Sequence, residues 1–568
     1  MAEKDMSQLR HSAAHLLAHA LLELFPQTIL TIGPATKDGF FYDFLPVTNL
    51  KESDLPAIEA RMLEIANRNL PIEHTQIPKE KAREIYKNNR FKLELIDGIP
   101  GDTTGLATQG DFYDLCKGGH VETTGQLKHF KLIGISGSYW RADRNDQPLQ
   151  RISGVVFFTE KELNAYLTLR EEAMKYDHRK IGKQMDLFSF HDEGIGFPFF
   201  HPKGKVILNV MAAYMRKIIG KAGYKEISTP IMLNEELWKQ SGHYAHYKDN
   251  MFFCHMDEET YAIRPMNCPG SALLYRERPR SYRELPLRLA EFALDHRYEI
   301  SGALHGLFRV RAFTQDDGHI YCTVDQIKQE VLTTIKMVHE VMHKFGFEKI
   351  SIRLSTRPEK SLGTDEFWEK AEQSLKGALE AAGATYTIQE GEGAFYGPKI
   401  EFHIEDAMGR TWQCSTIQLD FFLSHNFDLT YINSHGQKEY PVVIHRAVYG
   451  TFERFLGIMT EHYKGNFPFW LSPVQVRVLT ITDDQRAYAD EIMQKLNDAS
   501  IRTEMDESSD PISGKIKTAQ LDRIPWMLVL GNKEVENKTV TLRHRDGKQE
   551  FGLSIEDVIT RARELNAF

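Results

Sequence analysis

The hydrophobic pattern is clearest at the start of the chain, where residues 6–25 predict an amphipathic helix. Apolar residues recur there at helical spacing, and Pro26 ends the segment. The apolar positions are Leu9, Ala13, Leu16, Leu17, Ala20 and Leu24. His11, His15 and His19 follow one another four residues apart, mostly on the opposite face. A single helical histidine is typically structural or exposed, but a pair at this spacing can line a cleft or hold a metal.

A different pattern, over residues 295–322, predicts a β-hairpin. Residues two apart in a strand share a face, which places Arg297 and Glu299 side by side, and a turn-prone loop leads to a second strand at Phe308–Phe313. Beyond that strand, polar residues crowd against two apolar ones: Gln315, Asp316, Asp317 and His319 beside Ile320 and Tyr321. Buried polar groups need partners, so this cluster indicates a site. The alternative is a surface hairpin with a solvated acidic turn.

The rest of the chain separates into regions by its pattern. Residues 159–182 are charged and helical in period, and strand patterns dominate residues 188–469. Lys399–Asp406, for example, alternates strictly between apolar and polar positions. From Val474 onward, strands and helices alternate, which predicts a compact mixed α/β domain of about 95 residues.

Composition narrows the class of protein. A chain of 568 residues exceeds one domain, and 42% hydrophobic with 26% charged residues is ordinary for a globular protein. A net charge of −9 argues against a general nucleic-acid coat, although local basic patches remain compatible with it. Five scattered cysteines predict a reducing compartment, the cytoplasm, and the sequence has no apolar run of about 18 residues that would predict a membrane span.

Two further segments change the interpretation of the hairpin. RPMNCPG spans Arg264–Gly270, and VIHRAVYGTFERFLG spans Val443–Gly457. Together with the hairpin they resemble the catalytic core of the class II aminoacyl-tRNA synthetases, specifically the threonyl-tRNA synthetase family. The resemblance extends along essentially the whole chain. The P-loop and class I signatures, which mark other ways of binding ATP, do not occur in the sequence.

The resemblance implies an α+β protein of several domains. An α+β editing domain is expected over residues 1–160, a linker helix over 161–182, an antiparallel-sheet catalytic domain over 183–470, and a mixed α/β anticodon-binding domain over 471–568. Pro230 resembles the motif 1 proline of the family's dimer interface, so a homodimer is expected. The chain begins almost at the histidine helix, so the small ubiquitin-like domain that usually precedes it in the family is expected to be absent.

Cys116 and His120 repeat the four-residue spacing of the N-terminal histidines. From the residue types alone, these two residues with His11 and His15 make a four-ligand zinc site. The resemblance implies instead a metal-free pocket that hydrolyses mischarged Ser-tRNA(Thr). The further pocket residues that it implies are Tyr42, Lys92 and Asp114. Gly118 and Gly119 stand where the family has Gly-Pro, which brings the rigidity of this loop into question.

Amino-acid activation brings a carboxylate to the α-phosphate of ATP, so two anions must meet. Pre-placed cations and Mg²⁺ are then the main means of catalysis, and no side chain need act as a nucleophile. The resemblance implies that Arg297 holds the α-phosphate and that Glu299 reads the adenine amino group. It assigns the γ-phosphate to Arg454 and makes Lys399 a further cation beside the phosphates. Arginine suits such tasks because its guanidinium is planar and always charged.

Gln413 and Gln418 match nucleotide-side and substrate-side positions of the family. They have opposite strand parity, so both can face one pocket only if a bulge or bend lies between them. The other substrate-side residues that the resemblance implies are Gln315, Asp317 and Tyr396.

Cys268, His319 and His445 are 51 and 126 residues apart, and their spacing alone does not link them. The resemblance links them as the ligands of one Zn²⁺ per chain, with one coordination position left open. L-Threonine would bind the metal through its amino and hydroxyl groups, whereas valine, which a plain apolar pocket distinguishes poorly, lacks the hydroxyl. Serine has both groups and is smaller, so a second, hydrolytic site is required.

At the C-terminal end, the resemblance implies that Glu534 and Arg543 contact the anticodon bases of tRNA(Thr). The nearby basic residues Lys515, Lys517 and Arg523 could follow the RNA backbone. The alternative is an ordinary solvated face.

The activity implied is ATP-dependent activation of threonine, its transfer to tRNA(Thr), and hydrolysis of the mischarged product. The alternatives are a class II enzyme for serine, proline or histidine, a catalytically idle relative that regulates by binding RNA, and a metallohydrolase centred on the N-terminal cluster.

Overall fold

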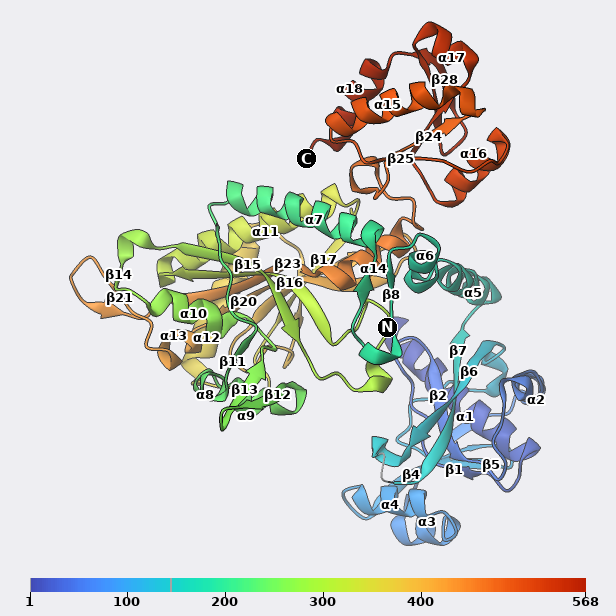
Figure 1. The fold of residues 1–568 in the computed structure, drawn as a ribbon. Helices are drawn as coiled ribbons and strands as arrows, with labels where there is room; N and C mark the ends of the chain where they lie inside the picture. Colours follow the sequence, from blue (N-terminus) through green and yellow to red (C-terminus); the bar gives the residue numbers. More distant parts are fainter. Residues whose placement is uncertain (1, 144–145) are drawn as a thin grey trace. The chain divides into compact units, whose positions relative to one another are not determined.

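A computed structural model describes residues 2–143 and 146–568 of the chain. Its contacts divide the chain into two units, residues 1–172 and residues 173–568, both drawn in Figure 1.

Helix α1 (Ala2–Leu24) is the centre of the first unit. It packs against α2 (Leu55–Asn67), β2 (Phe40–Leu45) and β7 (Pro148–Phe157), and its predicted apolar face is buried. His15 and His19, on the other face, are also buried, because Phe112 packs against both rings. The histidine face therefore points into the unit and not to solvent.

Two sheets surround this helix, with strand orders β1-β2-β7-β6 and β3-β4-β5. The remaining elements of the unit are β1 (Ile29–Leu30), β3 (Ile72–Pro78), α3 (Lys79–Ile85), α4 (Arg90–Gly98), β4 (Thr103–Gln109), β5 (Phe112–Leu115) and β6 (His129–Tyr139).

The charged segment that the sequence predicts as one helix over residues 161–182 is two helices. They are α5 (Glu160–Lys175) and α6 (His178–Gln184). The break occurs at Asp177, whose side chain accepts a hydrogen bond from the backbone N–H of Arg179 and so caps α6.

The second unit contains an eight-stranded sheet of order β10-β15-β16-β23-β20-β19-β17-β18. Its pairs are antiparallel except at the two edges, where β10 pairs with β15 and β17 with β18 in parallel. The strands are β10 (Lys225–Glu226), β15 (Leu287–His296), β16 (Ala312–Cys322), β17 (Ile350–Ser355), β18 (Tyr386–Gln389), β19 (Lys399–Glu405), β20 (Thr411–Asp420) and β23 (Val442–Thr451).

The two faces of this sheet have different coverings, as Figure 1 shows. Apolar residues such as Ile320 and Ile444 face a large core shared with α7 (Pro202–Lys221), α11 (Ile327–Lys344), α12 (Asp365–Ala381) and α14 (Phe452–His462). On the other face, Tyr321 and Val443 pack with α10 (Cys268–Arg276) and α13 (Phe422–Asn426). Successive side chains of a strand point to opposite faces, so the residues directly before and after each core residue face the side of the sheet that α10 covers.

Shorter elements complete this part of the second unit. They are β8 (Phe188–Ser189), β9 (Phe199–Phe200), β11 (Met232–Asn234), α8 (Glu235–Gln240), α9 (His243–Tyr247), β12 (Phe252–Met256), β13 (Glu259–Ile263), β14 (Arg280–Ser281), β21 (Tyr431–Ile432) and β22 (Lys438–Glu439).

The predicted hairpin exists, but its strands have other limits. β15 ends at His296, just before Arg297, and β16 begins at Ala312, so residues 297–311 form a loop. Backbone groups of this loop bond to other segments: the N–H of Tyr298 donates to the carbonyl of Asn250, and that of Arg311 to Gly196. The polar cluster past the loop lies inside β16 and not in an acidic turn.

The C-terminal part forms a five-stranded sheet of order β25-β24-β26-β27-β28, parallel over the first three strands. Its elements are β24 (Val476–Thr480), α15 (Arg486–Asp498), β25 (Thr503–Met505), α16 (Ile512–Leu521), β26 (Trp526–Leu530), α17 (Asn532–Asn537), β27 (Val540–His544), β28 (Gln549–Leu553) and α18 (Ile555–Asn566). The sequence pattern predicts this mixed α/β domain but misses α17 and β28.

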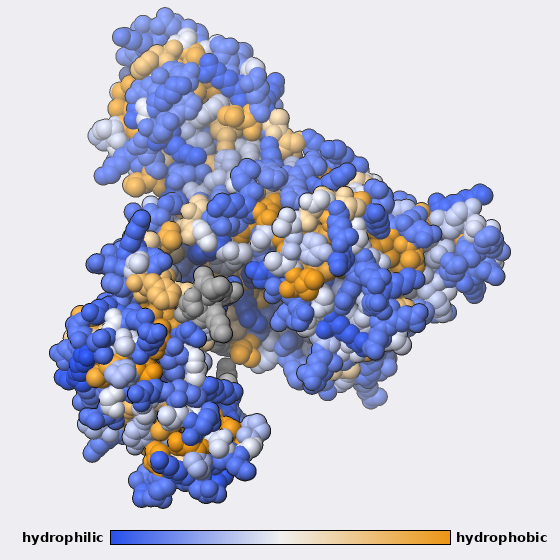
Figure 2. Space-filling model, turned by 180° about the vertical axis from the view of Figure 1, so that it is seen from behind, coloured by the Kyte–Doolittle hydropathy of each residue, from blue (hydrophilic) through white to orange (hydrophobic). Residues whose placement is uncertain are grey.

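Hydrophilic residues cover most of the face drawn in Figure 2, and hydrophobic residues form separate patches on it. Within the described residues, no helix is both long and apolar enough to cross a bilayer.

Candidate active sites

Two cavities gather the side chains that the sequence analysis singled out. One, of about 450 Å³, lies beside α1 in the first unit. The other, of about 440 Å³, lies on the α10 side of the large sheet. The predicted residues that line this second cavity are Cys268, Arg297, Gln315, Asp317, His319, Tyr396, Lys399, Gln413, Gln418 and His445.

A β-bulge in β20 brings Gln413 and Gln418 to the same cavity. Gln413 and Ser415 pair with successive residues of β19, so Cys414 has no residue opposite it. Residues five apart in a regular strand face opposite sides of the sheet, but the extra residue returns Gln418 to the side that Gln413 faces. The bulge therefore lies where the sequence requires one.

Strand register brings the three predicted metal ligands together. His319 in β16 pairs directly with His445 in β23, and Cys268 begins α10 beside them. Their candidate ligand atoms all lie within 4.8 Å of one another. His445 Nε2 lies 3.0 Å from a carboxylate oxygen of Asp420, which leaves its other nitrogen available.

This cluster offers the ligand atoms that a metal site needs, and one of them makes no hydrogen bond within the described chain. The buried Nε2 atom of His319 has no hydrogen-bond partner among the described residues. Burial lowers the pKa of His319 to about 4 and raises that of the Cys268 thiol well above its usual value. One thiol, which a bound cation would convert to a thiolate, together with two imidazole nitrogens fits Zn²⁺.

The predicted substrate-side residues stand close to this cluster. Asp317 Oδ2 lies 3.7 Å from His319 Nε2, and Asp317 Oδ1 accepts a hydrogen bond from the N–H of Gly318 at 3.0 Å. The hydroxyl of Tyr396 donates to Gln418 Oε1 at 3.1 Å. Asp317 comes from β16, Gln418 from β20 and Tyr396 from the loop before β19, and all three line the cavity that holds the Cys268, His319 and His445 cluster.

Glu401 holds the two phosphate-side residues Lys399 and Gln413. Its Oε1 atom lies 2.7 Å from Lys399 Nζ and accepts from Gln413 Nε2 at 2.5 Å. The hydroxyl of Ser355 donates to its other oxygen at 2.8 Å. The sequence analysis missed Glu401, although its position two residues after Lys399 in a strand puts both on one face.

Arg297 lies in the cavity wall between two aromatic rings. Its guanidinium carbon is 5.5 Å from the ring centre of Tyr247 and 5.0 Å from that of Phe313. Its Nε donates to the carbonyl of Pro265 at 3.3 Å. The cation is thereby oriented while most of its donors stay available for an anion.

Arg454 and Glu299, two predicted ATP contacts, do not line the cavity. Arg454 lies in the first turn of α14, where its Nη1 donates to the carbonyl of Phe308 at 3.4 Å, and its Nε is buried without a partner in the described chain. Glu299 is paired with Arg309 at 2.9 Å.

Arg264 connects the segment that carries Cys268 to two other segments, and the sequence analysis assigned it no role. It is 2% exposed, and its Nη1 donates to Thr229 Oγ1 at 2.7 Å, to Asn267 Oδ1 at 3.0 Å and to Glu291 Oε1 at 3.2 Å. A buried arginine with this many partners fixes the relative positions of the segments that supply them. Its position in RPMNCPG was the available signal.

His178, Asp177 and Glu461 form another group with metal-binding side chains. His178 Nδ1 lies 2.7 Å from Glu461 Oε1, and its Nε2 accepts from the N–H of Leu307 at 2.9 Å. Both ring nitrogens are thus satisfied by the protein, which makes this a structural contact and not a metal site.

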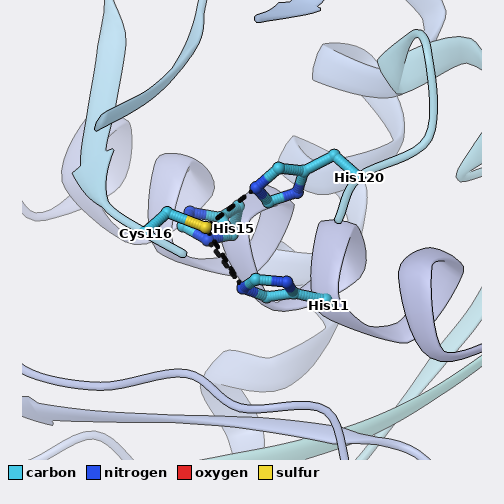
Figure 3. Close-up of side chains that lie close together, drawn as sticks. All are labelled: His11, His15, Cys116 and His120. Carbon is cyan, nitrogen blue, oxygen red and sulfur yellow. Dashed lines mark hydrogen bonds between the residues drawn. The ribbon is translucent and has the colours of Figure 1, made fainter. Parts of the chain in front are cut away.

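In the first unit, His11, His15, Cys116 and His120 converge as Figure 3 shows. Cys116 Sγ lies 3.0 Å from His120 Nε2 and 3.5 Å from His11 Nε2, and the Nε2 atoms of His11 and His15 are 3.3 Å apart. The two pairs spaced four apart therefore meet.

A second, fully buried group supports this cluster. The hydroxyl of Tyr42 donates to Asp114 Oδ2 at 2.5 Å, and Lys92 Nζ bonds both to Asp114 Oδ1 and to the Tyr42 oxygen. Asp114 Oδ2 also lies 3.5 Å from His15 Nδ1. Because a lone buried charge is unfavourable, the pairing of Lys92 with Asp114 stabilises both.

Burial keeps the N-terminal cluster uncharged. It lowers the pKa of His120 to about 4, holds the pKa of His15 well below its usual value, and raises that of Cys116 to about 11. Near neutral pH the site therefore offers neutral imidazoles beside a protonated thiol, and these can accept a proton from water.

The backbone conformation of the loop between Cys116 and His120 depends on its two glycines. Gly118 and Gly119 have φ angles of 93° and 86°. Proline is restricted to φ near −65°, so Gly119 adopts a conformation that a Gly-Pro sequence could not.

In the C-terminal part, Glu534 of α17 and Arg543 of β27 do not bond to each other. Glu534 Oε1 accepts from the hydroxyl of Thr541 at 2.8 Å, and the buried Nε of Arg543 has no partner among the described residues. Of the nearby basic residues, Lys515 is only 5% exposed, which removes it from the predicted run along an RNA backbone.

Three family models match the chain. Residues 252–463 match the tRNA synthetase class II core domain (G, H, P, S and T), and residues 475–565 match an anticodon binding domain. Residues 105–153 match the threonyl and alanyl tRNA synthetase second additional domain.

Similar proteins agree with these matches. A threonine–tRNA ligase of Carboxydothermus hydrogenoformans is 52% identical over 98% of this chain and 88% of its own length, and one of Clostridium tetani is 49% identical over the same shares. A solved structure of the RNA binding domain of threonyl-tRNA synthetase from Cryptosporidium parvum is 40% identical, with a TM-score of 0.66 over 69% of this chain and 98% of its own.

Proposed function

The chain belongs to the threonine–tRNA ligases, and from that premise we propose how its two cavities divide the work of the enzyme. The enzyme activates L-threonine with ATP, transfers it to tRNA(Thr) and hydrolyses mischarged Ser-tRNA(Thr). The observation that carries this conclusion is identity near 50% across 98% of the chain, together with matches to the class II core, the anticodon-binding domain and the second additional domain. Nothing found supports a catalytically idle relative.

Activation is assigned to the cavity in the large sheet. ATP enters with Mg²⁺ as the class II core requires; Arg297 takes its α-phosphate, Lys399 stands beside the phosphates, and Gln413 lies on the nucleotide side. Arg454, in the first turn of α14 and outside the cavity lining, takes the γ-phosphate. Glu299 reads the adenine amino group. These groups stabilise the charge that develops as the carboxylate attacks.

Threonine is selected beside Cys268, His319 and His445, which would hold one Zn²⁺ per chain. That ion, when bound, would supply a Lewis acid to which the amino and hydroxyl groups of threonine could bind, whereas valine lacks the hydroxyl. Asp317 accepts the hydroxyl hydrogen of the substrate. Gln315, Tyr396 and Gln418 complete the wall and exclude larger side chains.

Hydrolysis of Ser-tRNA is assigned to the N-terminal cavity. The neutral imidazoles of His11, His15 and His120 beside Cys116 can take a proton from a positioned water. The buried group of Tyr42, Lys92 and Asp114 fixes the wall of this pocket. We propose that this pocket works without a metal.

The proposed domains are the editing domain at 1–160, the linker at 161–182, the catalytic domain at 183–470 and the anticodon-binding domain at 471–568, where Glu534 and Arg543 contact the bases. We further propose that the protein forms a homodimer through the segment around Pro230. We also propose that it works in the cytoplasm, where its five cysteines remain free thiols.

Threonine-dependent exchange between ATP and pyrophosphate tests the activity. We expect exchange with threonine, weaker exchange with serine and almost none with valine. Equal exchange with valine would contradict the metal-based selection, and no exchange with any amino acid would contradict the enzyme itself.

A further inference from the structure

The edge of the C-terminal sheet carries an aromatic ring that the fold does not use. Phe551 in β28 has 73% of its surface exposed, more than any other large apolar residue in the described chain. A single exposed apolar residue is ordinary. The position of this one relative to its neighbours is what calls for an explanation.

A β-bulge turns Phe551 outward. The pairing of β28 with β27 shifts by one residue, so that Phe551 and Gly552 both lie opposite Thr541. Gly552 has a φ of 69°, a backbone conformation that favours glycine. The preceding Glu550 turns toward α18 and accepts from Arg561 Nη1 at 2.8 Å. Alternation along the strand then directs Phe551 to the sheet face away from α18.

That face also carries the two residues assigned to the anticodon. Thr541, opposite Phe551, donates its hydroxyl to Glu534. Arg543 lies two residues further along β27, on the same face, with its buried Nε unpartnered in the described chain. Phe551, Thr541 and Arg543 thus share one face of the sheet, and the carboxylate of Glu534 in α17 reaches that face at Thr541.

We propose that Phe551 is a stacking platform for an unpaired base of the tRNA anticodon loop. Unstacked bases in loops bind by hydrogen bonds to their edges and by stacking on aromatic rings. Glu534 and Arg543 supply the first kind of contact, and Phe551 supplies the second. This inference rests on the proposed role of the C-terminal domain in reading tRNA.

The test measures charging of tRNA(Thr) by full-length variants, with pyrophosphate exchange as a check that the activation site is intact. A base stacked on an aromatic ring is worth enough that Phe551→Ala should raise the KM for tRNA about 5- to 100-fold. Phe551→Trp should keep or lower this KM, whereas Phe551→Leu, apolar but not aromatic, should resemble alanine. Leu565→Ala, an exposed residue of α18 on the other face, is the matched control and should change nothing.

Salt dependence separates stacking from charge. Arg543→Ala should weaken tRNA binding and flatten its salt dependence, because a cation is lost, whereas Phe551→Ala should weaken binding with an unchanged slope. If Arg543→Ala has its effect and Phe551→Ala has none, stacking is wrong and the domain's role stands. If neither variant affects charging, the proposed role of the domain fails as well. A change in oligomeric state with Phe551→Ala at constant KM would show a protein contact and overturn the inference.

Discussion

The two cysteine–histidine clusters use the same kinds of side chain but differ in whether those side chains contact one another. In the first unit, His11, His15, Cys116 and His120 contact one another at 3.0 to 3.5 Å. Around the large sheet, no hydrogen bond among the described atoms joins Cys268, His319 and His445, although their ligand atoms lie within 4.8 Å.

Each cluster nevertheless keeps one buried ring nitrogen without a hydrogen bond among the described residues, His15 Nδ1 in the first and His319 Nε2 in the second. Buried polar groups that bond to each other are already stable, whereas a buried ring nitrogen without a partner costs free energy until something binds it. Carboxylates also stand beside the second cluster: Asp420 contacts His445, and Asp317 lies near His319. Metal-binding residue types at short range are therefore insufficient to identify a metal site.

The largest effect is expected from removing a ligand of the second cluster. Cys268→Ser should abolish both bound zinc and threonine activation, because two imidazoles alone hold Zn²⁺ poorly. Metal analysis of the purified chain, alongside pyrophosphate exchange, measures both. Cys116→Ser is the matched control and should keep one zinc per chain with normal activation.

Two results would break the comparison. Stoichiometric zinc in Cys268→Ser would exclude this ligand set. Two zinc ions in the unaltered chain, falling to one in Cys116→Ser, would place a metal in the N-terminal cluster.

Removing phosphate-side cations should have the next largest effect and should leave zinc in place. Arg297→Ala and Arg454→Ala should each slow adenylate formation by about 10²- to 10³-fold, since each removes charge stabilisation from ATP. Pre-steady-state adenylate formation measures this loss. Arg83→Ala, an exposed arginine of the first unit, is the control, and near-normal rates in either test variant would refute the corresponding role.

Changing the first cluster should spare activation and remove proofreading. With His11 and His15 both changed to alanine, threonylation should stay within about twofold of normal while Ser-tRNA accumulates, because the lost step follows transfer. Hydrolysis of pre-formed Ser-tRNA is the direct measurement. A double variant that clears this substrate at the usual rate would sink the assignment of the pocket.

The smallest effect expected is a displaced pH dependence of editing. Burial lowers the pKa of His120 to about 4, so this imidazole stays neutral and able to accept a proton well below pH 6.5. Enzymatic hydrolysis of Ser-tRNA, after subtraction of spontaneous hydrolysis, should stay nearly constant from pH 7.5 to 5.5 and fall only as pH approaches 4. A midpoint near 6.5 would show that a solvated histidine controls the step.

The local sequence pattern predicted which helices and strands exist better than it predicted where they begin and end. The helix over residues 6–25 is present as α1, because its signal comes from the apolar spacing of many residues. The hairpin strands were misplaced because the backbone of residues 297–311 bonds to distant segments such as Asn250 and Gly196. Such partners cannot be recognised from the local sequence, and the same holds for the hydrogen bonds that position Arg264 and Glu401.

The sequence by itself determined the periodic elements, the two His/Cys pairs spaced four apart, and the need for a bulge between Gln413 and Gln418. All three follow from the fixed geometry of helices and strands, which any local stretch of chain obeys. Only the tertiary structure decided that the bulge falls at Cys414 and that His15 faces the interior. It also decided that Cys268, His319 and His445 meet, because strand register joins residues whatever their separation along the chain.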